Sequence, residues 1–437
     1  MSARSAGACA GAGPAPARAD GERPAASIER LTHGRARAAA VATAALILAA
    51  GAAWAATAAT ADLTRYFTPE DLARAHAFRA ARYPLFLARM ATHLAALAAL
   101  VALAPALVRA AGRIARGVPA RFAEAATVAV VVAVVRIAPW IVELPASLSV
   151  RRIDRAAGFV HQGWGGWAAD QALAFALDLA VTIPIAFALL ALVRRVRRYW
   201  IPVAAAGAAL LVAGVFVWPV TVEPLFNRFT PLEAGEVRAR AEDLLERAGL
   251  EPGPMFVMDA SRRASWSNAY VTGLGKTQRV VLYDTLLERF TPAEIGAVLA
   301  HEIGHRARRH LLLGSALAIP AIVAGMAVAA FLLRRLGHPG GPRTGPEFLA
   351  AFAFVLALLS TLAAPVSSAV SRRIEADADR YALSLVNDPE DVLRAEIALA
   401  RTNRSDPSPP GWAVLLFYSH PPLAERVAMA EKSVRAR

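Results

Sequence analysis

The hydrophobic residues of this 437-residue chain are gathered into seven long stretches separated by polar segments. Each stretch is close to the length of about 20 residues that an α-helix needs to cross a lipid bilayer. The pattern therefore predicts seven transmembrane helices, at residues 38–60, 84–108, 124–146, 172–193, 200–221, 311–334 and 347–369. The first stretch is longer than the apolar region of a signal peptide and starts far from the N-terminus, so we expect a membrane anchor there.

Three sections of the chain are polar. Residues 1–37, rich in Ala, Gly, Pro and Arg, lack apolar periodicity and are predicted to be a disordered tail. A segment at 222–310 lies between the fifth and sixth spans, and a second segment at 370–437 follows the seventh. We expect these two segments to carry the catalytic residues, with the helices of 38–221 and 311–369 forming the membrane part.

Local patterns in the segment 222–310 predict a small unit of helices and strands. Residues 230–233 have the form of a capping box with Pro at the first helical position, which predicts a helix to about residue 249. A second capping box at 291–294 predicts a helix that runs directly into the sixth span, and the seventh span is expected to continue as a helix to about residue 387. Three β-strands are predicted at 255–258, 268–272 and 279–283. The expected fold class is therefore mainly α, with seven transmembrane helices and a small α+β catalytic domain.

Composition agrees with a membrane protein. Hydrophobic residues make up 57% of the chain and charged residues 19%, against roughly 25% charged residues in soluble domains. The formal net charge is +14, and only Lys276 and Lys432 are lysines, so arginine carries the charge, as GC-rich codon usage would give. Many arginines lie between apolar stretches, such as Arg194 and Arg195, where they would meet anionic lipid headgroups. No basic stripe is interleaved with aromatic residues, so we expect no nucleic-acid partner.

The strongest chemical motif is His301-Glu302-Ile303-Gly304-His305. Histidines four residues apart lie on one face of a helix, about one turn apart, and can hold a single metal ion. Glu302 is then angled toward a water on the metal, whose proton it can accept. The only cysteine is Cys9, so an intramolecular disulfide is excluded and any metal must be held by histidines and carboxylates.

A zinc site with two histidines needs a further protein ligand. Glu375 and Asp379 are the best candidates, because they are four residues apart on the predicted helix and share a face. Glu375 would complete a set of two histidines and one glutamate, and Asp379 could accept a hydrogen bond from a ligand imidazole. Asp377 is the competing carboxylate, but it points away from the face that the other two share.

The motif His301-Glu302-x-x-His305 followed by Glu375-x-x-x-Asp379 resembles the M48 metallopeptidases, and specifically the Ste24-type CAAX prenyl proteases. The number and placement of the spans also resemble that family. So do four further segments, at 224–232, 267–273, 282–286 and 419–422.

The resemblance implies a gluzincin-like peptidase with one zinc ion per chain. The zinc ligands that it implies are His301, His305 and Glu375. It also implies Glu302 as general base, Asp379 as a supporting residue and His420 as a hydrogen-bond donor to the scissile carbonyl. From the residues alone, His420 is a histidine in a turn stiffened by prolines.

Substrate and setting follow from the same resemblance. An extended peptide would pair with the strand containing Asn268, Ala269, Tyr270 and Val271, by addition of a β-strand. The expected partners are membrane lipid and a peptide or protein substrate that is prenylated or otherwise membrane-associated, and we expect a monomer in the cell membrane. Arginines in the loops 109–122 and 194–199 favour an external catalytic segment by the positive-inside rule, whereas the resemblance implies a cytoplasmic one, which we follow.

Four ionisable residues fall in or beside the predicted spans: His93, Arg136, Glu143 and Asp178. Such residues avoid lipid, so two interpretations stay open, a water-filled chamber like that of the Ste24-type family or simple pairing between helices. Two alternative functions also stay open. The first is a membrane quality-control protease resembling HtpX, which usually has fewer spans. The second is a non-enzymatic scaffold or transporter with a vestigial metal site, which the intact Glu302 argues against.

Overall fold

The computed structural model describes residues 60–436. Within this range, six helices are long and apolar enough to cross a membrane. The first predicted span, 38–60, and the predicted tail, 1–37, lie outside the described residues except at residue 60. The six spans are Pro69–Ala102 (α2, Pro69–Ala80, and α3, Tyr83–Ala102), Ala120–Ala156 (α5), Trp164–Arg195 (α6), Trp200–Phe226 (α7, Trp200–Val217, through α8, Glu223–Phe226), His310–Arg335 (α12) and Phe348–Leu385 (α13).

Each of the six remaining predicted spans corresponds to one of these helices. Only the predicted span 84–108 extends further, because its last residues lie in a separate helix, α4 (Ala104–Ile114). Their facing sides form an apolar core in which α3, α5, α6, α12 and α13 meet around Val131, Leu190, Leu333 and Phe348. Their outer sides stay apolar as well, with Leu210, Leu317 and Val366 about half exposed or more. An apolar surface of this extent on long helices is what a lipid environment requires.

The polar elements form a small unit around a four-stranded sheet of order β1-β2-β4-β3. Strand β2 runs parallel to β4, and the two outer strands run antiparallel to their neighbours. The strands are β1 (Phe229–Pro231), β2 (Met255–Met258), β3 (Ala269–Thr272) and β4 (Arg279–Tyr283). The three predicted strands are confirmed, and β3 lies at an edge of the sheet.

The predicted start of this helix at residues 230–233 is wrong, whereas its end near residue 249 is confirmed. Thr230 lies in β1, where it pairs with Val257, and the helix α9 begins only at Glu236 and ends at Arg247. A capping box is a local preference worth about 1 kcal/mol, and here pairing with β2 outweighs it. Pro231 fits this place because an edge strand does not need every backbone N–H.

The second capping box is confirmed at the start of α11, Pro292–Ala307. The Thr291 hydroxyl accepts a hydrogen bond from Glu294 N, and the Glu294 carboxylate accepts one from Thr291 N. However, α11 does not run directly into the sixth span. The chain turns at Arg309, whose φ of 55° is left-handed, and α12 begins at His310.

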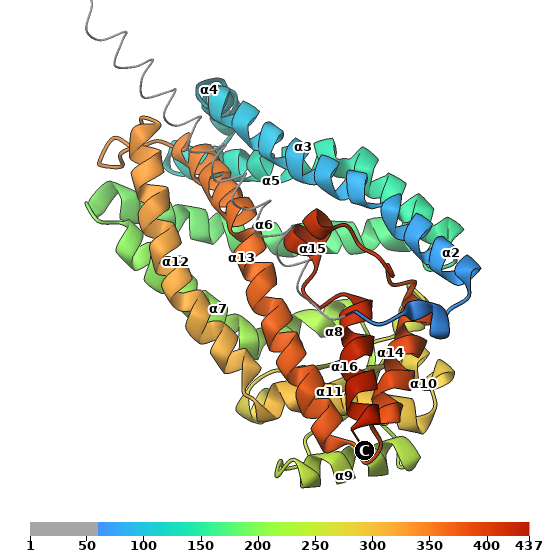
Figure 1. The fold of residues 1–437 in the computed structure, drawn as a ribbon. Coiled ribbons are helices and arrows are strands. Elements are labelled where there is room, and N and C mark those ends of the chain that lie inside the picture. The colour runs from blue at the N-terminus through green and yellow to red at the C-terminus, as the bar shows by residue number, and fades with distance from the viewer. Residues whose placement is uncertain (1–59, 437) are drawn as a thin grey trace, which may run out of the picture. The chain divides into compact units, whose positions relative to one another are not determined.

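The seventh span does continue past the predicted membrane region, because α13 is one helix of 38 residues. Figure 1 shows α9, α11, α14 and α16 gathered around the C-terminal half of α13, away from α4. The remaining helices of this unit are α10 (Asp284–Arg289), α14 (Pro389–Asn403), α15 (Gly411–Phe417) and α16 (Leu423–Arg435). The long helix α13 therefore connects the membrane part directly to the polar unit.

Candidate active site

Helix α11 carries His301 and His305 on one face, as the spacing of four predicts. Their Nε2 atoms lie 3.1 Å apart, and their side chains are 12% and 22% exposed. The Nε2 atoms of both imidazoles thus face the same small region between the rings.

Glu375 comes to this point from α13. Its Oε2 atom lies 3.2 Å from His301 Nε2 and 3.5 Å from His305 Nε2. The approach depends on Gly304, because a Cβ there would lie 3.2 Å from the Ala378 carbonyl oxygen and 3.3 Å from Tyr381. Glycine lets the two helices touch at the height of the motif.

The three donor atoms fit a tetrahedral zinc ion. Bonds of about 2.0–2.1 Å to zinc place two ligand atoms of a tetrahedron about 3.3 Å apart, and the three observed separations are 3.1, 3.2 and 3.5 Å. Glu375 Oε2 is buried and makes no hydrogen bond to any residue that the structure describes. A buried carboxylate oxygen beside several imidazoles, with no hydrogen bond of its own, is the environment of a metal ligand.

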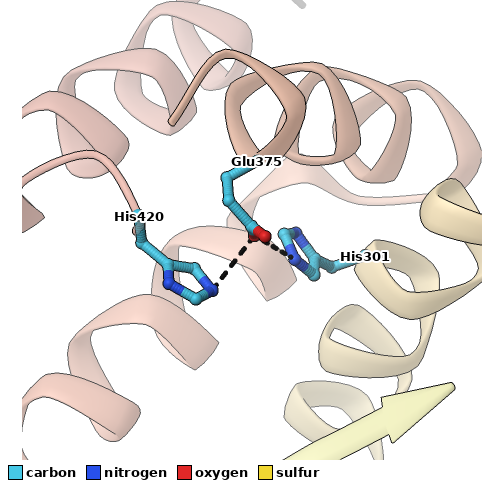
Figure 2. Close-up of side chains that lie close together, drawn as sticks. All are labelled: His301, Glu375 and His420. Atoms are coloured by element: carbon cyan, nitrogen blue, oxygen red, sulfur yellow. Dashed lines mark ion pairs between the residues drawn. The ribbon is translucent and has the colours of Figure 1, made fainter. Parts of the chain in front are cut away.

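His420 reaches the same carboxylate from the opposite side, as Figure 2 shows. It lies in the turn between α15 and α16, and its Nε2 atom is 3.0 Å from Glu375 Oε2. His301, Glu375 and His420 could therefore also share an ion. The His420 side chain is 53% exposed, whereas His305 is packed on the same helix as His301, so His305 is the better third ligand.

The turn that carries His420 is held by Arg372 of α13. Arg372 is buried and donates hydrogen bonds to the carbonyl oxygens of Val414 and Tyr418, at 2.8 and 2.9 Å. These bonds attach the His420 turn to the same helix as Glu375. His420 is thereby placed next to the carboxylate, although nothing in the sequence around it predicts the distance.

Glu302 faces the edge strand β3. Its Oε2 atom accepts a hydrogen bond of 3.1 Å from the backbone N–H of Val271. Burial raises the pKa of the Glu302 carboxyl, although the neighbouring histidines oppose this shift. The carboxyl group therefore lies next to both the two histidines of α11 and the predicted substrate strand.

The four predicted substrate residues have different surroundings. Val271 contacts Glu302, and Asn268 lines a cavity of about 480 Å³ together with His420. Ala269 is buried at the start of β3, where it pairs with Leu282. Tyr270 donates a hydrogen bond from its hydroxyl to the Glu223 carboxylate, at 3.1 Å. Of the four residues, Asn268 and Val271 are thus the two with contacts to the proposed site residues His420 and Glu302.

Asp379 lies behind His301, as its spacing from Glu375 predicts. Its Oδ1 atom is 2.8 Å from His301 Nδ1. Arg426 of α16 donates two hydrogen bonds to the same carboxylate, at 2.6 and 2.9 Å, and lies 2.6 Å from the Glu396 carboxylate of α14. Sequence reasoning missed Arg426 and Glu396, because no motif spacing connects α14 and α16 to the histidines.

The carboxylates also determine the charge of His301 when no metal is bound. Burial opposes a charge on the imidazole, but the hydrogen bond to Asp379 and the neighbouring carboxylate of Glu375 outweigh burial and raise the pKa of His301 to about 10. The charge of a protonated His301 is balanced by both carboxylates. A metal ion must therefore displace this proton to bind.

The intramembrane ionisable residues form pairs and also line a cavity. Arg136 of α5 makes two hydrogen bonds to Asp178 of α6, at 2.7 and 2.8 Å, and His93 Nδ1 is 2.6 Å from the Glu143 carboxylate. All four border a cavity of about 660 Å³ whose wall is mostly apolar. Pairing between helices is therefore observed, and the four residues also border a cavity within the membrane part, while the water-filled chamber stays a prediction.

Fold and site together define a multi-pass membrane protein with the donor set of a metallopeptidase. Two family models match the chain: "CAAX prenyl protease N-terminal, five membrane helices" at residues 53–228, and "Peptidase family M48" at residues 231–434. The chain belongs to peptidase family M48. The match to the first model favours the CAAX-type branch over an HtpX-like protease.

Comparisons with individual proteins agree with this family assignment. The chain is 30% identical over 282 residues to the uncharacterized metalloprotease YhfN of Bacillus subtilis, covering 63% of this chain and 66% of that protein. It is 37% identical over 229 residues to CAAX prenyl protease 1 of Saccharomyces cerevisiae, covering 48% and 50%. The matches thus span half to two thirds of these relatives. The crystal structure of S. mikatae Ste24p superposes with a TM-score of 0.72 at 25% identity, covering 86% of this chain and 92% of that one.

Arg426 is predicted to be essential for stability. Replacing it by Met leaves the buried carboxylates of Asp379 and Glu396 beside each other without the guanidinium that contacts both, and breaking a buried ion pair costs about 3–5 kcal/mol. Arg435→Met is the matched control on the same helix, because the Arg435 side chain is 69% exposed and its partner Glu431 keeps the hydrogen bond from the Tyr66 hydroxyl, so a smaller loss of stability is expected. Thermal unfolding of the detergent-solubilised variants measures both. Equal melting temperatures for the two variants would contradict the assigned network.

Zinc uptake is predicted to release a proton from His301. Near pH 8 the metal-free imidazole is protonated, because its pKa of about 10 lies above the pH. As the pH increases through about 10, fewer protons are therefore released per zinc ion bound, and the apparent affinity for zinc rises. Calorimetric titration of zinc in buffers of different ionisation enthalpy measures the number of protons released. Heats that are independent of the buffer at pH 8 would show that His301 is already neutral.

Proposed function

We propose that this protein is a membrane-integral zinc metalloendopeptidase that hydrolyses peptide bonds near the membrane interface. The observation that carries the proposal is the convergence of His301 Nε2, His305 Nε2 and Glu375 Oε2 within 3.5 Å, with Glu302 on the same helix. These three atoms would hold the ion. A zinc ion bound there would polarise a carbonyl group and lower the pKa of a water toward about 7.

The remaining residues then have distinct roles. Glu302 accepts the proton of the attacking water and delivers it to the leaving amine, and its contact with Val271 N keeps the carboxylate beside the substrate strand. His420 donates from Nε2 to the oxygen of the scissile carbonyl as negative charge develops there. Asp379 keeps the proton of His301 on Nδ1, which leaves Nε2 as the metal-binding nitrogen.

Substrate binding is proposed at the outer edge of β3. An extended peptide can add to this edge through backbone hydrogen bonds, which need little particular sequence. The peptide would run past Glu302, since the carboxylate already contacts the strand at Val271. His420 borders the cavity of about 480 Å³ at the other end of this path, together with Asn268.

The proposed substrate class is a peptide with an attached prenyl chain. Similar proteins are named CAAX prenyl protease 1, and a CAAX substrate ends in a prenylated Cys-a-a-X. Three cavities with shared wall residues lie along the way from the site to the membrane part. The cavity beside His420 shares Phe86 and Phe417 with a smaller one, which in turn shares His93 and Glu143 with the apolar cavity of about 660 Å³.

Glu302→Gln is predicted to abolish most peptide cleavage while keeping the zinc. The amide cannot accept the proton, so kcat falls by about 10²–10⁴-fold, whereas the three ligands are untouched. Glu294→Gln on the same helix is the control, because Gln also completes a capping box. Zinc content and cleavage of a fluorogenic peptide are measured for both purified variants. Equal cleavage by Glu302→Gln and the unmodified protein would contradict the mechanism.

A farnesyl group on the substrate is predicted to lower KM. A peptide ending in Cys-a-a-X is compared with and without a farnesyl thioether, because the apolar cavity would bury the lipid. Ala353→Phe narrows that cavity, which Ala353 lines, and should raise KM for the farnesylated peptide alone. If both peptides have the same KM, the substrate class is wrong even though the peptidase mechanism stands.

A further inference from the structure

The second ring nitrogen of His305 has a partner outside the proposed donor set. His305 Nδ1 lies 3.0 Å from Nδ1 of His310, and His310 Nε2 lies 3.2 Å from Asp377 Oδ2. The His310 side chain is only 5% exposed. The buried imidazole of His310 thus connects His305, a proposed metal ligand, to the carboxylate of Asp377.

Backbone geometry brings His310 to this place. A continuous helix from α11 into α12 would carry residue 310 well around the helix from residue 305. Instead the chain takes a left-handed conformation at Arg309, with φ at 55°, and α12 starts anew at His310. A non-glycine residue in this region is uncommon, and here it turns the first residue of α12 back onto the motif.

The contacts require one arrangement of protons. If His305 binds a metal through Nε2, its proton is on Nδ1 and needs an acceptor. The only atom of His310 within reach is Nδ1, which must then carry the lone pair. His310 therefore carries its proton on Nε2 and donates it to Asp377. In this arrangement each hydrogen bond of the series His305–His310–Asp377 has one donor and one acceptor. If the proton of His310 were on Nδ1 instead, the lone pair of its Nε2 atom would face the Asp377 carboxylate.

We propose that His310 and Asp377 are positioning residues that fix the tautomer and orientation of His305 as a metal ligand. The proposal rests on the proposed metal site. Asp377 is itself held in place, because Arg308 donates two hydrogen bonds to it, at 2.8 and 3.1 Å, and Arg380 one at 3.3 Å. His305 thus has a support separate from that of His301, which is backed by Asp379 and Arg426.

The two supports differ in charge. His301 donates directly to a carboxylate, whereas His305 donates to a neutral imidazole that stands between it and the carboxylate. Groups that accept a hydrogen bond from a ligand histidine affect metal affinity by about 10–100-fold. A merely structural His310 would instead affect folding, with no effect that depends on His305. Metal affinity and its dependence on His305 therefore distinguish the two roles.

The test measures zinc affinity of the full-length protein by competition with a chelator. His310→Leu removes the acceptor and is expected to weaken zinc binding by about 10–100-fold. His310→Asn places an amide oxygen where Nδ1 was and should recover most of the affinity. His338→Leu is the matched control, since His338 follows the opposite end of α12, and should bind zinc normally. Absorption spectra of the cobalt-substituted proteins should change for His310→Leu alone.

A double-mutant cycle identifies the route of the effect. In a His305→Ala background, His310→Leu should cause no further loss of zinc affinity. Unchanged affinity in His310→Leu, failure of His310→Asn to recover it, or an equal loss in both backgrounds would each overturn the proposal. If His301→Ala and Glu375→Ala bind zinc as tightly as the unmodified protein, the metal site of the proposed function fails as well, which is a separate and recognisable result.

Discussion

The arrangement of the site depends on the close contact between α11 and α13 at Gly304. Even a Cβ at this position would require the neighbouring helix to move by a few tenths of an ångström, since the nearest atoms of Ala378 and Tyr381 would lie 3.2 and 3.3 Å from it. Because α13 is also a membrane-spanning helix, the position of the carboxylate is tied to the packing of the membrane part. Helix packing thus determines whether the three donor atoms can converge.

Bringing the site residues together buries several charged groups, and neighbouring groups of opposite charge offset the cost of removing them from water. Arg426 balances the carboxylates of Asp379 and Glu396, because an unpaired charge in such a place is strongly destabilising. Glu375 instead lies beside the imidazoles of His301, His305 and His420 and, among the described residues, forms no ion pair with an arginine or lysine. This difference separates two of the acidic residues of α13: Asp379 is paired with an arginine, while Glu375 faces imidazoles that can hold a positively charged ion together with it.

Much of the fold and the proposed site follows from sequence, because the relevant signals are local. Apolar stretches predicted six described helices, the spacing of four placed His301 and His305 together, and the same spacing put Asp379 behind the site. Features set by tertiary contacts could not be predicted. The pairing of Thr230 in β1 overrode a capping box, the turn at Arg309 interrupted an expected continuous helix, and Arg426 and His310 reach the site from elements without a motif.

The central claim is that a metal ion is held by two imidazoles and one carboxylate. X-ray absorption at the zinc edge of the purified protein measures this ligand set directly. The account predicts a shell of nitrogen and oxygen atoms at about 2.0–2.1 Å, with the scattering pattern of two imidazoles and without sulfur. Two imidazoles should remain in His420→Ala and one in His305→Ala. Loss of an imidazole from the zinc shell in His420→Ala but not in His305→Ala would contradict the account.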